Sequence, residues 1–124
     1  MIYLDTHVVV WLASERSRFS EPALNLIKNT ETLYVSPMVE LELQYLYEIG
    51  RLKLQSTPIL EYLQRALSIT RCHKSFIDVV HAAKAMHWTR DPFDRLITAQ
   101  CSLSSSTLIT ADDVIQEHYP HTVW

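Results

Sequence analysis

Short apolar runs of β-forming residues recur along the chain, each bounded by polar residues. The clearest are "MIYLD" at residues 1–5, "TLYVS" at 32–36 and "STLIT" at 106–110. Runs of this kind, rich in Val, Ile, Tyr and Thr, predict buried strands. "LSIT" at 67–70 and the terminal "HTVW" at 121–124 are weaker strand predictions. We expect the last of them to lie at the edge of a sheet.

Segments of helical period lie between and after these runs. Apolar residues recur three and four positions apart in five segments, namely Ser20–Lys28, Pro37–Ile49, Pro58–Leu67, Ser75–Met86 and Pro92–Leu103. Strands that alternate with helices form a parallel sheet with helices on both faces. The pattern therefore predicts an α/β fold, a three-layer α/β/α domain whose central parallel sheet has four to five strands.

The segment from Pro37 to Ile49 is ambiguous, because "VELELQYLY" also alternates like a strand. Ser36 and Pro37 suit the cap and the first residue of a helix, and Gly50 suits the position just past its end. These signals favour a helix. Its residues are apolar around most of the circumference, so we expect another chain to cover its outer face.

The composition narrows the class of protein. With 124 residues and 48% hydrophobic content, the chain is expected to form a single domain over residues 1–124. It has no apolar run of membrane-spanning length and no signal-peptide pattern, so we expect a cytoplasmic protein. Its single glycine, Gly50, excludes the glycine-rich loops of P-loop NTPases and dinucleotide dehydrogenases. Cys72 and Cys101 are far apart and are predicted to be buried core residues.

Four acidic residues are predicted to meet at one edge of the sheet. Asp5 ends the first strand, and Asp112 follows the strand "TLIT" with one residue between. Glu42 lies early in a helix that follows a strand, and Asp94 lies in the first turn of a helix that leads into one. All four positions belong to the carboxyl end of a parallel sheet, where α/β proteins bind ligands.

This group of carboxylates predicts a metal site. Four such groups do not all stay ionised at close range without a cation, because like charges raise one another's pKa. Mg²⁺ prefers oxygen ligands and promotes attack of water on phosphodiesters. The net charge of −3 provides no basic surface for nucleic acid, so a metal would have to hold such a polyanion. Asp91, directly before Pro92, is instead a ready helix cap.

At these residues the chain resembles the PIN-domain ribonucleases, and in particular the VapC-like toxins of type II toxin–antitoxin pairs. "YLDTHVVVWLAS" is similar to the family's first acidic segment and "SPMVELELQYLYEIGRLKL" to its second-acid helix. "RDPFDRLITAQ" resembles the third-acid motif, and "LITADDVI" resembles the closing T-x-D. The order and spacing match over nearly the whole chain. One departure is Leu41, where many relatives have tryptophan.

The resemblance implies an endoribonuclease that depends on Mg²⁺ or Mn²⁺. It implies four catalytic, metal-binding acids, which are Asp5, Glu42, Asp94 and Asp112. Thr110 would supply a hydroxyl that supports the site, and Thr6 is a weaker candidate for the same role. The implied protein partners are a VapB-like antitoxin, whose tail enters the acidic pocket, and a second copy of the chain in a homodimer. The implied substrate is RNA, with transfer RNA as a candidate.

At two places, two neighbouring acids compete for one position of the family's acid motif. Glu40 and Glu42 both lie near the second-acid position, and counting back from Gly50 selects Glu42. Asp113 beside Asp112 raises the same question.

Three basic residues near the acids also have two interpretations. His7, two residues past Asp5, either contacts substrate or has a packing or surface role. Arg90 and Arg95 flank the third acid, where they either meet phosphates or form surface ion pairs. No histidine spacing indicates a zinc site.

Two other functions remain compatible with the sequence. A haloacid-dehalogenase-like phosphatase also has an Asp after its first strand, but it usually needs a second acid two residues on, where this chain has His7. A binding module without catalytic activity would use the acidic pocket to receive a basic partner peptide. Metal-dependent cleavage of RNA separates the nuclease from the binding module.

Overall fold

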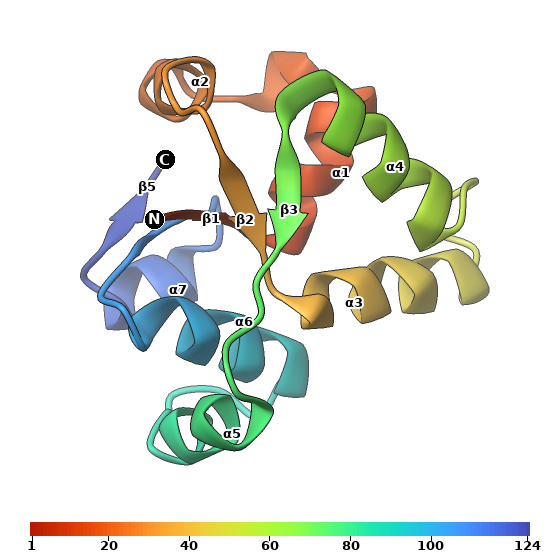
Figure 1. The fold of residues 1–124 in the computed structure, drawn as a ribbon. Coiled ribbons are helices and arrows are strands. Elements are labelled where there is room, and N and C mark those ends of the chain that lie inside the picture. Colours follow the sequence, from red (N-terminus) through yellow and green to blue (C-terminus); the bar gives the residue numbers. More distant parts are fainter.

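The apolar runs form a central sheet of five parallel strands in the computed structural model, which describes residues 1–124 (Figure 1). The strands are β1 (Ile2–Leu4), β2 (Leu33–Val35), β3 (Ile69–Arg71), β4 (Thr107–Ile109) and β5 (Thr122–Val123). Their order is β3-β2-β1-β4-β5, and every neighbouring pair is parallel. The terminal strand β5 lies at an edge, as its sequence predicts.

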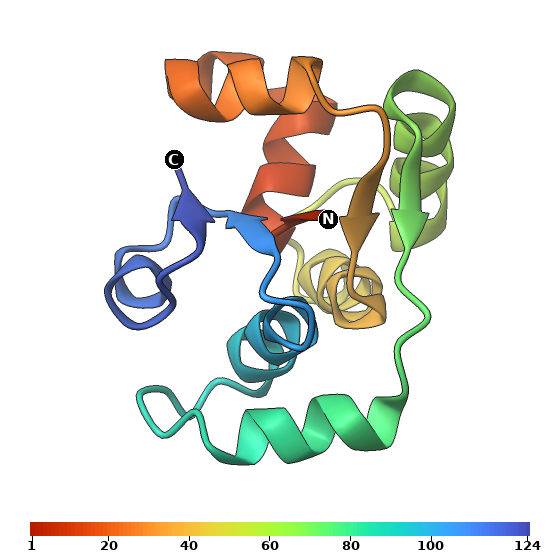
Figure 2. The ribbon, with the colours of Figure 1, turned by 60° about the vertical axis from the view of Figure 1, so that its left-hand side comes forward.

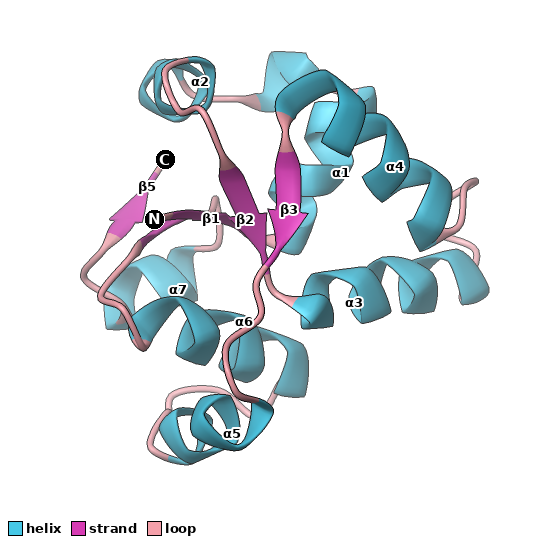
Figure 3. Ribbon diagram, in the orientation of Figure 1, coloured by secondary structure: helices cyan, strands magenta, loops and turns pink.

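Helices cover both faces of the sheet. They are α1 (Thr6–Ser14), α2 (Glu21–Lys28), α3 (Pro37–Glu48), α4 (Ser56–Leu67), α5 (Phe76–Lys84), α6 (Pro92–Ser102) and α7 (Asp113–His118), with a 3₁₀ turn η1 at Arg16–Arg18 (Figure 3). Helices α1, α3 and α4 lie on one side, and α6 and α7 lie on the other, with α5 packed outside α6 (Figures 1 and 2). The three-layer α/β/α architecture with a parallel sheet is confirmed.

Two helices of the structure are absent from the sequence prediction, and several predicted boundaries move by one or two residues. Helix α1 contains Val8, Val9 and Val10, whose β-branched side chains have low helix propensity. Burial of Val8 and Val9 in the core offsets that preference. The short helix α7 was also not predicted. Helix α4 begins two residues before the predicted Pro58 and extends through Leu67, so β3 begins at Ile69.

Helix α3 resolves the ambiguous segment in favour of the helix. The Ser36 side chain accepts a hydrogen bond from the Met38 backbone N–H and caps the start. Gly50 has φ 82° just past the end, in the left-handed region that glycine adopts most readily. Val39 and Leu43 are buried, whereas three apolar side chains on the outer face are exposed, namely Leu41, Tyr45 and Ile49. The outer face of α3 is therefore apolar and open in the single chain.

The buried apolar side chains form one main cluster between the sheet and the helices on both faces. Cys72 and Cys101 are buried and free, as their separation in the sequence predicts. The Cys72 thiol lies 2.9 Å from the Tyr3 hydroxyl. None of the helices combines the length and apolarity that a membrane crossing requires.

Candidate functional site

The carboxyl ends of β1 and β4 meet at the point where the chain connections reverse direction. From β1 the chain proceeds to β2 and β3 on one side, whereas β4 lies on the other side and leads to β5. Such a switch point leaves a crevice that binds ligands in open α/β sheets. Asp5 follows β1 and Thr110 follows β4, and the Thr110 hydroxyl donates a 2.7 Å hydrogen bond to Asp5 Oδ2 across this point.

Asp5 is held rigidly and has little contact with solvent. Its Oδ1 accepts a 2.8 Å hydrogen bond from the Thr6 backbone N–H, so Asp5 also caps α1. The residue is only 4% exposed. Burial raises the pKa of Asp5, while the hydrogen bonds from Thr110 and Thr6 act in the opposite direction. A buried carboxyl with fixed orientation is suited to bind a cation.

Glu42 reaches the same place from α3. The Thr6 hydroxyl donates to Glu42 Oε1 at 2.5 Å, which links the second acid to the residue that follows the first. Burial raises the pKa of Glu42, and the charge of Asp5 raises it further. The structure therefore brings Glu42 and Asp5 together.

The neighbouring Glu40 points to a different partner. Its carboxylate pairs with the Arg71 guanidinium through two hydrogen bonds, at 2.6 Å from Nε and 2.9 Å from Nη2. Hydrogen bonding to Arg71 lowers the pKa of Glu40. This ion pair holds Glu40 at the end of β3, whereas Glu42 contacts Thr6 beside Asp5.

The start of α6 carries a cap and an acid with a strongly altered pKa. Asp91 Oδ1 accepts hydrogen bonds from the backbone N–H groups of Phe93 at 2.8 Å and Asp94 at 3.3 Å, which confirms the predicted cap. The pKa of Asp94 is raised from 3.8 to about 7. Burial is the largest cause, followed by the negative charges of four other acids, which are Asp91, Asp5, Asp112 and Glu42. Asp94 thus shares an electrostatic environment with all three other predicted site acids.

Asp112 lies at the start of α7, beside the end of β4. Its Oδ1 accepts a 2.9 Å hydrogen bond from the Ile115 N–H, and its own N–H donates to the Thr110 hydroxyl at 3.1 Å. Thr110 therefore connects Asp5 and Asp112. Asp113 is exposed at the first position of α7, and the hydrogen-bonded pair with Thr110 distinguishes Asp112 from it.

The donor set of this site fits a hard divalent cation. The four acids and two threonines offer only oxygen atoms, which Mg²⁺ and Mn²⁺ prefer. Each ionised acid makes ionisation of the others less favourable, which a cation would reverse. As the side chains lie, no three carboxylates converge closely enough on one point to form a complete ligand set.

Two of the three basic candidates, His7 and Arg95, behave differently. His7 is exposed on α1, and its charge acts to lower the pKa of both Asp5 and Glu42, so it lies within electrostatic range of the acids. Arg95 points toward α5, where its guanidinium donates to the carbonyl oxygens of Ala83 and Lys84. Of the two interpretations of Arg95, a surface ion pair is absent, because its guanidinium contacts backbone carbonyls of α5 and no carboxylate.

One buried polar side chain near this site was not singled out from the sequence. Thr98 lies one turn after Asp94 in α6, is fully buried, and its hydroxyl has no hydrogen-bond partner. The spacing of four residues places it on the same helical face as Asp94. That spacing is the only sequence signal that connects Thr98 with the acids.

Comparison with known proteins identifies the family. Residues 2–119 match the family model described as the PIN domain, and the chain belongs to that family. PIN domains are nucleases, so the chain is a member of a family of hydrolases that act on nucleic acid. This membership replaces the phosphatase alternative. No curated protein matches the chain.

Three solved structures share the fold over nearly the whole chain. VapBC2 from Rickettsia felis, bound to a DNA fragment from its promoter, is 22% identical with a TM-score of 0.68, covering 99% of this chain and 96% of that one. A toxin–antitoxin complex from Klebsiella pneumoniae is 16% identical with a TM-score of 0.67, and the match covers 100% of this chain and 97% of that one. DNA-bound VapBC from Salmonella typhimurium is 16% identical with a TM-score of 0.64, and the match covers 98% of this chain and 93% of that one.

Proposed function

We propose that this chain is the toxin of a VapBC-like toxin–antitoxin pair and that it hydrolyses RNA with Mg²⁺ or Mn²⁺. The proposal is carried by the hydrogen bonds at the switch point of the sheet, where Thr110 links Asp5 with Asp112 and Thr6 links Asp5 with Glu42. Besides burial, the charges of these three acids raise the pKa of a fourth, Asp94. We assign these four residues as the catalytic, metal-binding acids.

The residues around the acids have defined tasks in this proposal. The Thr110 hydroxyl and the Thr6 N–H hold the Asp5 carboxyl in one orientation, and the Thr6 hydroxyl holds Glu42. Without a cation the pKa of Asp94 is about 7, and a divalent cation beside it would favour its ionised form. A divalent cation, when bound, supplies activation of water and charge stabilisation for the leaving oxygen of a phosphodiester.

The proposed protein partners are a VapB-like antitoxin and a second copy of the chain. The fold shared with toxin–antitoxin complexes supports the first. The exposed apolar side chains of Leu41, Tyr45 and Ile49 on α3 support a protein contact on this face. Sedimentation of the purified chain and of Leu41→Lys tests the homodimer. A dimer that Leu41→Lys converts to a monomer is the expected result, and a monomeric parent chain would remove the homodimer.

Cleavage of total RNA and transfer RNA by the purified chain, free of any copurified partner, tests the enzyme. The parent chain is expected to give discrete products with Mg²⁺ or Mn²⁺ and none with EDTA. Asp94→Asn is expected to abolish them. Asp113→Asn is the matched control, because Asp113 is an exposed aspartate beside the site that makes no side-chain hydrogen bond or ion pair.

Each outcome has a clear meaning. Products that persist in EDTA or in Asp94→Asn would contradict the metal mechanism. The absence of cleavage of every RNA under both metals would favour the alternative in which the acidic pocket only receives a basic partner peptide. An equal loss of cleavage activity in Asp94→Asn and Asp113→Asn would contradict the assignment of Asp94 as a catalytic acid.

A further inference from the structure

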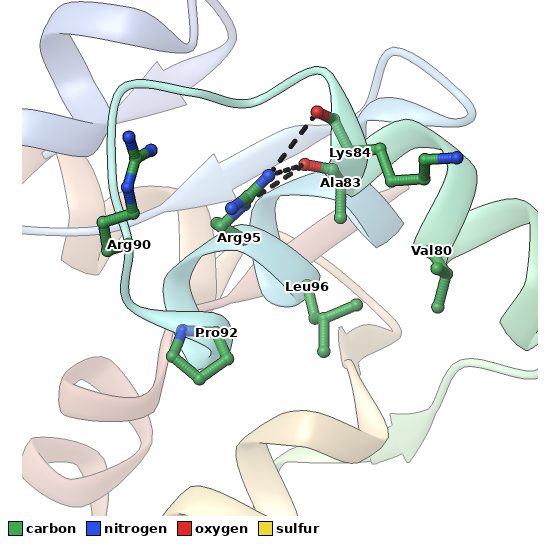
Figure 4. A pocket seen from close by; sticks show the side chains of 7 residues that line it. All are labelled: Val80, Ala83, Lys84, Arg90, Pro92, Arg95 and Leu96. Atoms are coloured by element: carbon green, nitrogen blue, oxygen red, sulfur yellow. Dashed lines mark hydrogen bonds between the residues drawn. The ribbon is translucent and has the colours of Figure 1, made fainter.

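A pocket of about 300 Å³ lies between α5 and the start of α6, and none of the four acids lines it (Figure 4). Three basic side chains line it, from three segments: Lys84 at the end of α5, Arg90 in the loop before α6, and Arg95 in α6. Val80 and Leu96 contribute apolar lining. In Figure 4 Arg95 lies between Arg90 and Lys84.

Arg95 is the fixed member of this group. Its Nε and Nη2 donate to the Ala83 carbonyl at 3.2 and 3.0 Å, and Nη2 also reaches the Lys84 carbonyl at 3.5 Å (Figure 4). These carbonyls belong to the carboxyl end of α5, where a helix attracts positive charge. The pocket therefore has one guanidinium in a set position before any ligand binds.

The other two charges are available to a ligand. The ion pairs of the structure are Arg18 with Glu15 and Arg71 with Glu40, and neither Lys84 nor Arg90 has a carboxylate partner. Arg90 donates only to the His87 carbonyl, at 3.3 Å. Both side chains are exposed. In a chain of net charge −3, three unneutralised cations around one pocket form a local site for an anion.

The helix geometry relates this pocket to the acids. Asp94 and Arg95 are consecutive in α6, and successive residues of an α-helix point about 100° apart. Arg90 likewise precedes the cap residue Asp91. The first turn of α6 therefore presents Asp94 on one side and Arg95, which lines the basic pocket, on the next. A strand of nucleic acid that lies against Asp94 passes the rim of the pocket.

We propose that the pocket lined by Lys84, Arg90 and Arg95 binds a backbone phosphate of the substrate strand, distinct from the phosphate that is cleaved at the acids. Arg95 shapes the pocket, and Lys84 and Arg90 contact the phosphate oxygens. The inference rests on the proposed nuclease function, and it assigns how an acidic chain binds and orients a polyanion. Contacts of this kind contribute affinity without reading sequence.

Binding of a fluorescent single-stranded RNA by the full chain tests the pocket, with Asp94→Asn present throughout so that the RNA stays intact. Lys84→Ala and Arg90→Ala are each expected to weaken binding about three- to tenfold at low salt and to reduce the salt slope by about 0.7. Lys28→Ala is the control for Lys84, because both are exposed lysines at the last position of a helix. Arg51→Ala, in an exposed loop, is the control for Arg90.

Steady-state cleavage by the same substitutions in the otherwise unaltered chain gives a second readout. The expected change is a higher KM with kcat unchanged, since a remote phosphate contact affects substrate and transition state alike. If the RNA affinity and KM of Lys84→Ala and Arg90→Ala equal those of the control variants, the pocket does not bind a substrate phosphate. Pocket-dependent binding in a chain that cleaves no RNA would instead retain the pocket and remove the nuclease proposal.

Discussion

Two buried threonines near the acids differ in what their hydroxyls contact. Thr110 donates to Asp5 and accepts from the Asp112 N–H, whereas the Thr98 hydroxyl has no partner. We expect Thr110→Val to lower the free energy of unfolding by roughly 1–3 kcal/mol, because it leaves Asp5 Oδ2 without its donor and the Asp112 N–H without its acceptor. Thr98→Val is expected to be neutral or to stabilise by about 1 kcal/mol, since it removes an unpaired hydroxyl at little change in shape.

Urea unfolding of the two metal-free variants measures this difference. A loss in Thr98→Val as large as that in Thr110→Val would show that the Thr98 hydroxyl has a partner, such as a bound water. Cleavage assays on the same proteins then separate stability from activity, because only Thr110 contacts a proposed catalytic acid.

At the scale of elements, Arg95 connects α5 to α6. Its guanidinium donates twice to the carbonyl oxygen of Ala83 near the end of α5, which also accepts from the Met86 backbone N–H at 3.0 Å. Arg95→Met keeps most of the apolar stem but removes these donors. We expect α5 to open more easily, with amide exchange in α5 accelerated by about one to two orders of magnitude, corresponding to roughly 1–3 kcal/mol, while exchange in the sheet changes little.

Hydrogen exchange resolved by segment provides the measurement, and the contrast between helices is its internal control. Uniform acceleration in α5 and in the strands would indicate global destabilisation and would contradict a local contact. Unchanged exchange in α5 would mean that apolar packing of Val79 and Ala83 is sufficient to hold the helix.

At the scale of the whole molecule, the acids make stability depend on pH. In the unfolded chain Asp94 loses its proton near pH 4, whereas in the folded, metal-free chain it retains the proton to about pH 7. The stability that this group contributes is therefore complete below about pH 4 and is lost as the pH rises to about 7. Asp5 and Glu42, whose pKa values are also raised, act in the same direction.

We therefore expect the metal-free chain to unfold at a lower temperature at pH 8 than at pH 5, and Asp94→Asn to reduce this difference. Mg²⁺ should restore stability mainly at pH 8, by about 2.7 kcal/mol at a concentration near 100 times its Kd. Thermal unfolding at both pH values, with and without EDTA, checks this. A parent chain that is equally stable at both pH values without metal would contradict the coupling of the acids.

The predicted positions of the acids show which features of the fold can be predicted from short stretches of sequence. Asp5 and Asp112 were assigned to one edge because each follows a strand, and strand ends can be read from short apolar runs. The predicted position of Glu42 depended on interpreting its segment as a helix and not as a strand. Ser36 and Gly50 at the two ends of the segment supported the helix. Helix α1 was not predicted, because its valines favour a strand until packing against the sheet is known.

The sequence by itself determined the order of the five strands and of helices α2 to α6, the positions of Asp5 and Asp112 after strand ends, and the cap at Asp91, because each depends on the residue types of one short segment. Only the tertiary structure decided that Glu40 pairs with Arg71, that Arg95 turns toward α5, and that Lys84 joins Arg90 around one pocket. Those outcomes depend on how helices rotate and pack against distant segments, and no local pattern encodes such contacts.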